Sequence, residues 1–120
     1  MNIAEFANAI IKAPNWQRLQ FVDDAGCTTY IENMHLDEDG SLILEDVMFE
    51  GYVNCLDLLR MIQKLTEYKT IPAKADTGTS MAGQVYVGTK HQEVADVQII
   101  NKAPVVHIKP IASMQISSVA

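Results

Sequence analysis

Apolar residues near the start of the chain recur with the period of an α-helix. Their spacing of i, i+3, i+4, i+7 and i+8 places the side chains on one helical face. The residues on this face are Ile3, Phe6, Ala7, Ile10 and Ile11. Asn2 can cap the start of the helix, with Glu5 three residues later, and Pro14 stops it. We expect this helix to cover a β core, because its other face has no cluster of Lys or Arg that would suit a membrane surface.

The pattern then changes to strand-like segments separated by turn residues. Residues 23–26 and 37–40 are rich in Asp and end in Gly, a composition that forms turns readily. The apolar alternation of the third segment breaks at Glu45 and Asp46, which predicts a β-bulge or a strong bend of the kind found in small barrels. Strands are expected at residues 16–22, 27–36, 41–49, 84–87, 94–100 and 105–111.

A second amphipathic helix is expected at residues 53–67, after the third strand. Asn54 is its predicted cap, and charged residues occupy the face opposite its apolar stripe. The stripe consists of Cys55, Leu58, Leu59, Ile62 and Leu65. Residues 68–82 contain Pro72 and Gly78 and few large apolar groups, which predicts a mobile loop. The sequence therefore predicts one domain, residues 1–120, with a helical and loop insertion at about 50–82. The fold class is mainly β, or α+β by content.

Composition and charge restrict the function. The chain has 120 residues, 48% of them hydrophobic and 20% charged, which is ordinary for one folded domain. The formal net charge of −6 argues against nonspecific binding to duplex DNA, which normally requires a basic patch or stripe. A local basic site remains compatible with an acidic chain, because net charge controls only the far field. No apolar run is long enough to span a membrane, and the N-terminus lacks the basic start and small-residue cleavage site of a signal peptide, so a cytoplasmic protein is expected.

The sequence contains no recognisable catalytic or metal-binding motif. Cys27 and Cys55 lack CxxC spacing and are expected to be buried free thiols rather than a disulfide. The three histidines are far apart, and the acidic turn at 37–39 lacks the spacing of a calcium loop. We therefore expect a non-enzymatic protein without a metal or cofactor. Trp16 is interpreted as core or interface material, with base stacking as the alternative.

Two short segments resemble the signatures of the Sm-like (LSm) family. The first signature is matched by Gly26, by Leu36 and Asp37, and by the strand Leu42-Ile43-Leu44-Glu45-Asp46, with the intervals of the family kept. The second signature is matched by Ile100, Val105, Val106, Ile108 and Pro110. Together they cover roughly half of the chain. The resemblance implies an N-terminal helix followed by a small, strongly bent five-stranded antiparallel barrel, here with an extra helix inserted after the third strand.

The resemblance also implies a site for single-stranded RNA, but several positions depart from the family pattern. Asp39 occupies the position of the side chain that stacks on a base, and Ser41 that of the Asn that hydrogen-bonds the base. Asp37 is kept, while Asn101 and Lys102 replace the Arg-Gly pair of the second signature. An aspartate offers no stacking face and repels phosphate, so the uridine pocket is expected to be degenerate.

Assembly into a homo-oligomeric ring is the remaining implication of the resemblance. In the family, the fourth strand of one subunit pairs with the fifth strand of the next, and an edge strand needs such a partner or protection. The residues expected at this interface are Val97, Ile99, Val105, Val106 and Ile108. The expected function is an Sm-like ring protein with an RNA-binding or RNA-chaperone-like role. The alternative is a non-enzymatic structural or protein-binding oligomer of mobile-element or phage type, and a small-ligand module that uses the crevice beside the inserted helix is a third class.

Overall fold

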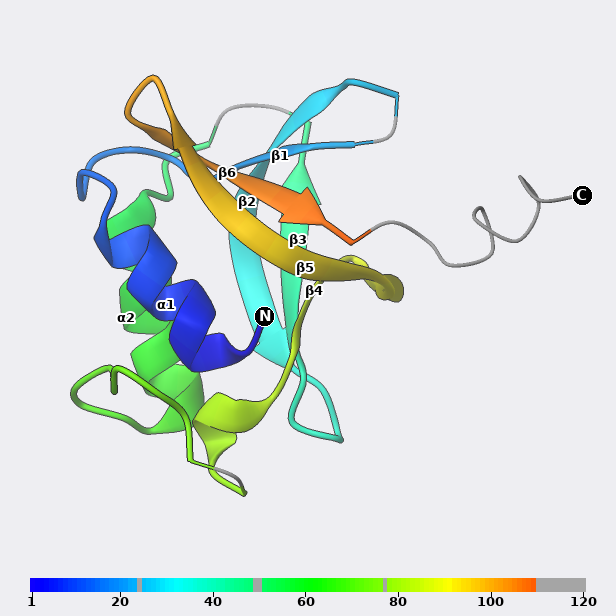
Figure 1. The fold of residues 1–120 in the computed structure, drawn as a ribbon. Coiled ribbons are helices and arrows are strands. Elements are labelled where there is room, and N and C mark those ends of the chain that lie inside the picture. Colours follow the sequence, from blue (N-terminus) through cyan, green and yellow to red (C-terminus); the bar gives the residue numbers. More distant parts are fainter. Residues whose placement is uncertain (24, 49–50, 77, 110–120) are drawn as a thin grey trace, which may run out of the picture.

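A computed structural model describes residues 1–23, 25–48, 51–76 and 78–109. The chain forms an α+β fold in which two helices lie on one side of a strongly bent sheet (Figure 1). The helices are α1 (Ile3–Ile11) and α2 (Cys55–Thr66), and a short 3-10 turn, η1, spans Ser80–Ala82. Several positions considered in the sequence lie outside the described residues: Phe49 and Ile111, where two strands were expected to end, Pro110 of the second signature, and the tail after Ala112.

Both helices begin as the sequence predicts. Asn2 accepts a hydrogen bond from the Glu5 amide, and the Glu5 side chain accepts one from the Asn2 amide, which completes a capping box. Asn54 and Asp57 form the same reciprocal pair at the start of α2. These caps satisfy backbone amides that have no partner inside the helix. The predicted N-terminal helix and inserted helix are therefore confirmed.

The strands form one mixed six-stranded sheet. They are β1 (Gln20–Val22), β2 (Thr28–Leu36), β3 (Leu42–Val47), β4 (Val85–Val87), β5 (Thr89–Ile100) and β6 (Ala103–Ile108). Each strand pairs with the next along the chain, and β1 also pairs with β6, so the sheet rolls into a small barrel. The β3–β4 and β1–β6 pairs are parallel, whereas the other pairs are antiparallel.

The strand number and directions differ from the five-stranded antiparallel barrel that the family resemblance implies. The inserted helix accounts for one difference: a helical crossover returns the chain to the end of the sheet where the previous strand began, so the next strand runs parallel to it. Residues between β3 and β4 include both α2 and η1, which agrees with the predicted insertion.

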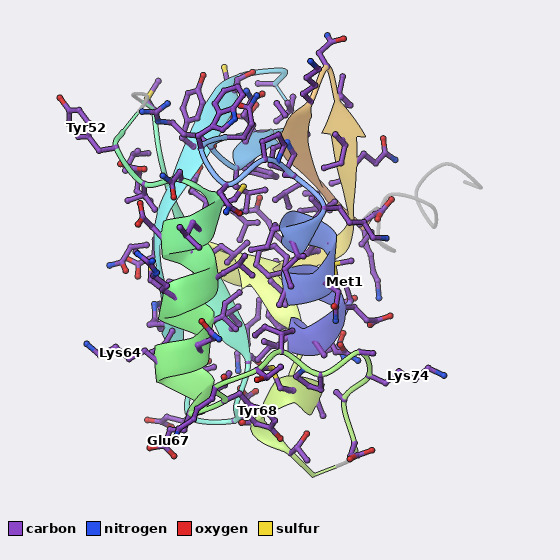
Figure 2. All side chains as sticks on the ribbon, turned by 90° about the vertical axis from the view of Figure 1, so that its left-hand side faces the viewer. Met1, Tyr52, Lys64, Glu67, Tyr68 and Lys74 are labelled. Atoms are coloured by element: carbon purple, nitrogen blue, oxygen red, sulfur yellow. The ribbon has the colours of Figure 1, made fainter. Side chains whose placement is uncertain are left out.

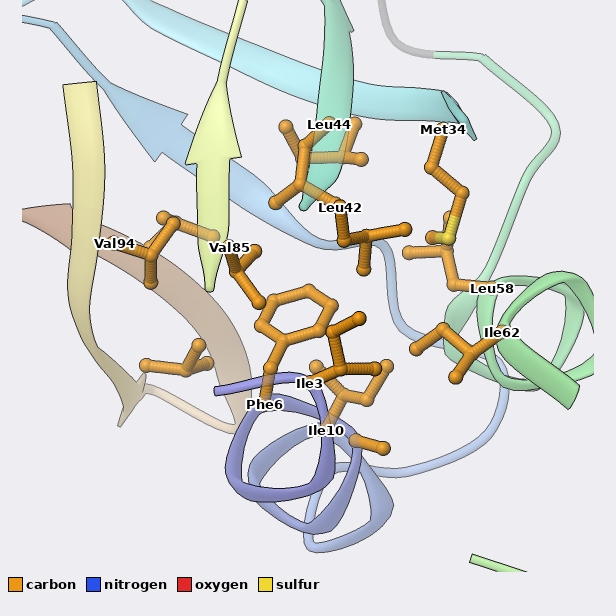
Figure 3. Close-up of a cluster of buried hydrophobic side chains, with 14 of the residues drawn as sticks. Ile3, Phe6, Ile10, Met34, Leu42, Leu44, Leu58, Ile62, Val85 and Val94 are labelled. Atoms are coloured by element: carbon orange, nitrogen blue, oxygen red, sulfur yellow. The ribbon is translucent and has the colours of Figure 1, made fainter. Parts of the chain in front are cut away.

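The core lies between α1, α2 and the concave face of the sheet (Figure 3). Phe6 from α1 packs in this cluster with side chains from β3, β4 and β5, and α2 adds Leu58 and Ile62. Four of the five residues in the predicted apolar stripe of α1 are fully buried, whereas the fifth, Ile11, is exposed; Ala4, which the stripe did not include, is fully buried as well. The segment expected to be a mobile loop contacts the rest of the fold at two points: Met81 is fully buried, and the Asn8 side chain donates to the Pro72 carbonyl, 2.8 Å away.

The irregularity expected at Glu45 and Asp46 is present. The register of the β2–β3 pair shifts between Ile31, opposite Asp46, and Asn33, opposite Glu45. The extra residue, Glu32, is therefore in β2 rather than in β3. A bulge bends the strand and re-aims one side chain, and here the Glu32 carboxylate accepts a hydrogen bond from the Val53 amide, 3.3 Å away, just before α2.

Candidate functional site

Three of the predicted RNA-binding residues lie in the turn between β2 and β3. The Asp37 amide donates to the Ser41 carbonyl, 2.8 Å away, and the Ser41 amide donates to an Asp39 carboxylate oxygen, 3.1 Å away. Ser41 is buried, whereas Asp39 is exposed. The hydrogen bonds of these polar groups therefore serve mainly to close the turn.

A lysine from the β4–β5 hairpin neutralises the acidic side chains of this turn. The Lys90 ammonium lies 2.8 Å from an Asp37 carboxylate oxygen and 2.5 Å from an Asp39 carboxylate oxygen. The hydrogen bond from Lys90, followed by hydrogen bonds from Ser41, lowers the pKa of Asp39 from 3.8 to about 2. The pKa of Asp37 is lowered as well, first by Lys90. A cation held in this way is a poor candidate for a phosphate contact.

The other two predicted RNA-binding residues are at the opposite end of the fold. Asn101 and Lys102 form the two-residue turn between β5 and β6, with φ values of 52° and 68°. Figure 1 places this turn at the top of the view and the β2–β3 turn at the bottom. The structure therefore brings Asp37, Asp39 and Ser41 together but does not bring them to Asn101 and Lys102. Lys109, directly after β6, forms an ion pair with Glu93.

The residues expected at a ring interface have different surroundings. Val97, Val105 and Val106 are buried, and Val105 and Val106 form ladders with β5 on one side and with β1 on the other. Ile108 is partly buried against the core, whereas Ile99 is 43% exposed. Around Val105 and Val106 both edges of β6 are thus already paired within the chain.

Three large apolar side chains in the segments that precede β1 and α2 are exposed, and we call them together the aromatic corner: Trp16, Met48 and Tyr52. Two chain segments build it, one between α1 and β1 and one between β3 and α2. Backbone hydrogen bonds join them, since the Cys55 amide donates to the Gln17 carbonyl at 2.8 Å and the Leu56 amide to the Asn15 carbonyl at 3.3 Å. The Arg18 side chain also donates to the Gly51 carbonyl. Trp16 and Tyr52 are therefore in adjoining segments.

The side chains of the aromatic corner are open to solvent. Trp16 is 66% exposed, Met48 74% and Tyr52 94%. Figure 2 shows Tyr52 projecting away from the body of the molecule just before α2. Sequence reasoning singled out Trp16 as core or interface material but missed Met48 and Tyr52. The available signal was their position beyond the broken alternation at Glu45 and Asp46, where apolar residues no longer have a core face to occupy.

The two thiols have different surroundings. Cys27 and Cys55 are both free; Cys55 is buried as predicted, whereas Cys27 is exposed, because it lies in the turn that the Asp23 carboxylate closes. Within the described ranges, no group of His, Cys, Asp and Glu could hold a metal ion. No helix in that part of the chain has the length and apolar character needed to cross a membrane.

Comparison with protein-family models, curated proteins and solved structures found no match to this chain.

Proposed function

We propose that this chain is a non-enzymatic structural protein that associates with copies of itself and buries its aromatic corner in the assembly. The observation that carries the proposal is the exposure of Trp16, Met48 and Tyr52 on adjoining segments. Trp, Tyr and Met are enriched at protein interfaces, and Trp and Tyr dominate their energetic centres. Moving one such side chain out of water contributes roughly 2 kcal/mol, so burial of the corner favours assembly.

The Sm-like resemblance supports a second candidate function, binding of single-stranded RNA. Lys102 favours it, because its side chain lies in an exposed turn. The distribution of charge opposes it. Lys90 and Lys109 are held by carboxylates, and the whole chain carries a net charge of −6. We therefore place assembly before RNA binding.

The single tryptophan gives a direct test of assembly. Trp16 is the only Trp of the chain, so its emission reports on the aromatic corner alone. We expect the emission to shift to shorter wavelength, and quenching by iodide to decrease, as the protein concentration rises and sedimentation shows masses above 13.3 kDa. A monomer with unchanged emission at every concentration would overturn the proposal.

Two variants show which surface is responsible. Tyr52→Ser should weaken association, because it removes an exposed ring from the corner. Lys64→Ser is the matched control, since Lys64 is an exposed residue near the other end of α2 (Figure 2), and it should leave association unchanged.

The same fluorophore separates assembly from RNA binding. Titration with single-stranded oligouridine should leave the Trp16 emission unchanged if the corner contacts protein, whereas stacking of a base on Trp16 would quench it. A different result would favour the RNA role implied by the family resemblance: oligouridine binds without quenching Trp16, and Lys102→Glu abolishes this binding. Asp39→His should then strengthen that binding by restoring a stacking surface.

A further inference from the structure

Strand β5 has one edge that is only partly paired. On its inner side it pairs with β6 from Val94 to Ile100. On the other side the ladder with β4 ends at Glu93, and no strand among the described residues pairs with positions 95–100 there. Side chains of this segment are mostly in solvent, including Ile99 at 43% and Ile100 at 47% exposure. Such an edge is a template for another strand.

The turn next to this edge determines which backbone groups point outward. Ile100 and Ala103 flank a two-residue turn and so form a hydrogen-bonded pair. The pairs then alternate, which directs the N–H and C=O groups of Ile99 and Val97 away from β6. Two observations agree with this assignment. Pro104, which has no N–H, sits opposite Ile99, and the Val97 N–H donates to the Asp96 carboxylate, 2.8 Å away, rather than to β6.

We propose that this edge pairs with the same edge of a second copy, so that β5 and its symmetry mate form an antiparallel ladder centred on Val97. This proposal rests on the proposed function and specifies one contact of the assembly. It differs from the ring implied by the family resemblance, in which different edges meet. A two-fold contact of this kind uses the same surface on both subunits and closes after two copies.

The charges of the strand favour this register. Segment 96–100 contains one charged residue, Asp96, and no lysine. Centring on Val97 sets Asp96 opposite Gln98 of the second copy, and Ile99 opposite Ala95. The Asp96 carboxylate can then accept from the Gln98 amide of the other copy, which releases the Val97 N–H to donate to the Val97 carbonyl across the interface. A register shifted by one step, centred on Gln98, would instead oppose Asp96 to the apolar Ile100.

Charge changes at Gln98 test the register. Gln98 is exposed, so its variants should fold normally, which circular dichroism can check. Gln98→Lys should tighten the dimer, because it creates an opposite-charge pair with Asp96 on each side of the two-fold axis. Gln98→Glu should weaken it through two like-charge pairs. Each pair contributes a modest energy, so we expect changes of about 2- to 30-fold in the dimer dissociation constant, measured by sedimentation. Weakening by both charges would overturn the Val97-centred register.

Cross-linking tests the contact itself. In a Cys27→Ser background, protein carrying Asp96→Cys is mixed with protein carrying Gln98→Cys. Residues directly opposite each other in a non-hydrogen-bonded pair are close enough for a disulfide. We expect the mixture to form far more covalent dimer than either protein alone, since identical positions meet only diagonally. Equal yields in all three samples would overturn the pairing.

The outcomes separate this inference from the proposed function. If neither Gln98 variant changes the dissociation constant of the assembly and no cross-link is preferred, the β5 pairing is overturned and the proposed function still stands. A 13.3 kDa species at every concentration overturns both.

Discussion

Gly83 lies so close to Gly40 that a Cβ built on Gly83 would be 2.0 Å from the Gly40 carbonyl oxygen. The backbone of Gly83 has φ −62° and ψ 153°, which any residue can adopt, so space rather than conformation requires glycine here. The Gly83 carbonyl also accepts the amide of Ile3 at 2.9 Å. This contact therefore fixes the β2–β3 turn, the chain before β4 and the start of α1 relative to one another.

Gly83→Ala should lower the free energy of unfolding by about 3 kcal/mol or more, because the added methyl group meets backbone rather than a flexible side chain. Gly26→Ala is the matched control. A Cβ there meets nothing within 4 Å, although φ is +82°, so only the conformational cost of about 1 kcal/mol applies. If urea denaturation gave the same loss of unfolding free energy for both variants, the backbone would have moved to remove the clash with the Gly40 carbonyl.

Replacing Lys102 with Gly should stabilise the fold by about 1 kcal/mol. Lys102 has φ +68°, a region that glycine enters without the steric cost of a Cβ. The same change at Asn101, φ +52°, should gain less, because Asn tolerates this conformation better. Thermal unfolding of the two variants measures the difference, and a loss of stability in Lys102→Gly would contradict the assignment of the turn.

Removing Lys90 should change the titration of Asp39. Because the pKa of Asp39 is lowered in the folded chain, its stabilising contribution is present above pH 4 and is lost as the pH falls toward 2. In Lys90→Met the pKa of Asp39 should rise toward 3.8 without reaching it, since the Ser41 hydrogen bonds remain. Carboxyl chemical shifts followed by NMR from pH 6 to 2 report this directly, and an unchanged midpoint would show that Lys90 is not the main cause.

Met81 should behave as a core residue despite its place in a connecting segment. It is fully buried, and Met81→Ala should cost about 2–5 kcal/mol through lost contacts and the cavity left behind. Met81→Leu, which keeps the volume, should cost less than about 1.5 kcal/mol. Limited proteolysis should accelerate between residues 68 and 82 in the alanine variant only. Rapid cleavage of the unmodified chain there would mean that Met81 does not anchor the segment.

The two thiols should react at very different rates. Cys27 is exposed, whereas Cys55 is fully buried and burial raises its pKa to about 11. Because the thiolate is the reactive form, a thiol reagent at pH 8 should modify one cysteine per chain quickly and the second only after unfolding. Cys27→Ser should abolish the fast phase, and two fast equivalents would contradict the burial of Cys55.

Local features of the fold could be predicted from the sequence because short segments specify them. The capping boxes at Asn2 and Asn54 need only a side chain and a backbone amide three residues away. The break in alternation at Glu45 marked where the β2–β3 pair is irregular, but not that the extra residue is in β2. The directions of the strands could not be predicted in this way. Whether β4 runs parallel to β3 depends on where α2 returns the chain, which no local pattern encodes.

The candidate site was harder to predict than the fold. A match to a family signature indicates the role of single positions, but it does not indicate whether two turns lie close together in the folded sheet. Asp39 and Lys102 lie at opposite ends of the fold because the twelve residues of β5 separate their turns. The ion pairs of Lys90 with Asp37 and Asp39 link residues some 50 positions apart and leave no trace in the sequence pattern. Exposure of Tyr52 likewise depends on the path of the chain into α2.

The position of β6 between β1 and β5 affects how the molecule can fold. Gln20 pairs with Val105, 85 positions later in the chain, since 105 − 20 = 85. Pairing of such distant segments costs the chain loop-closure entropy before any stabilising contact forms. Proteins rich in contacts of this kind fold slowly. During synthesis, β1 and β5 both emerge before their common neighbour. Until Ala103–Ile108 has been made, two strand edges stay open to other chains, and this interval is when misassembly competes with folding.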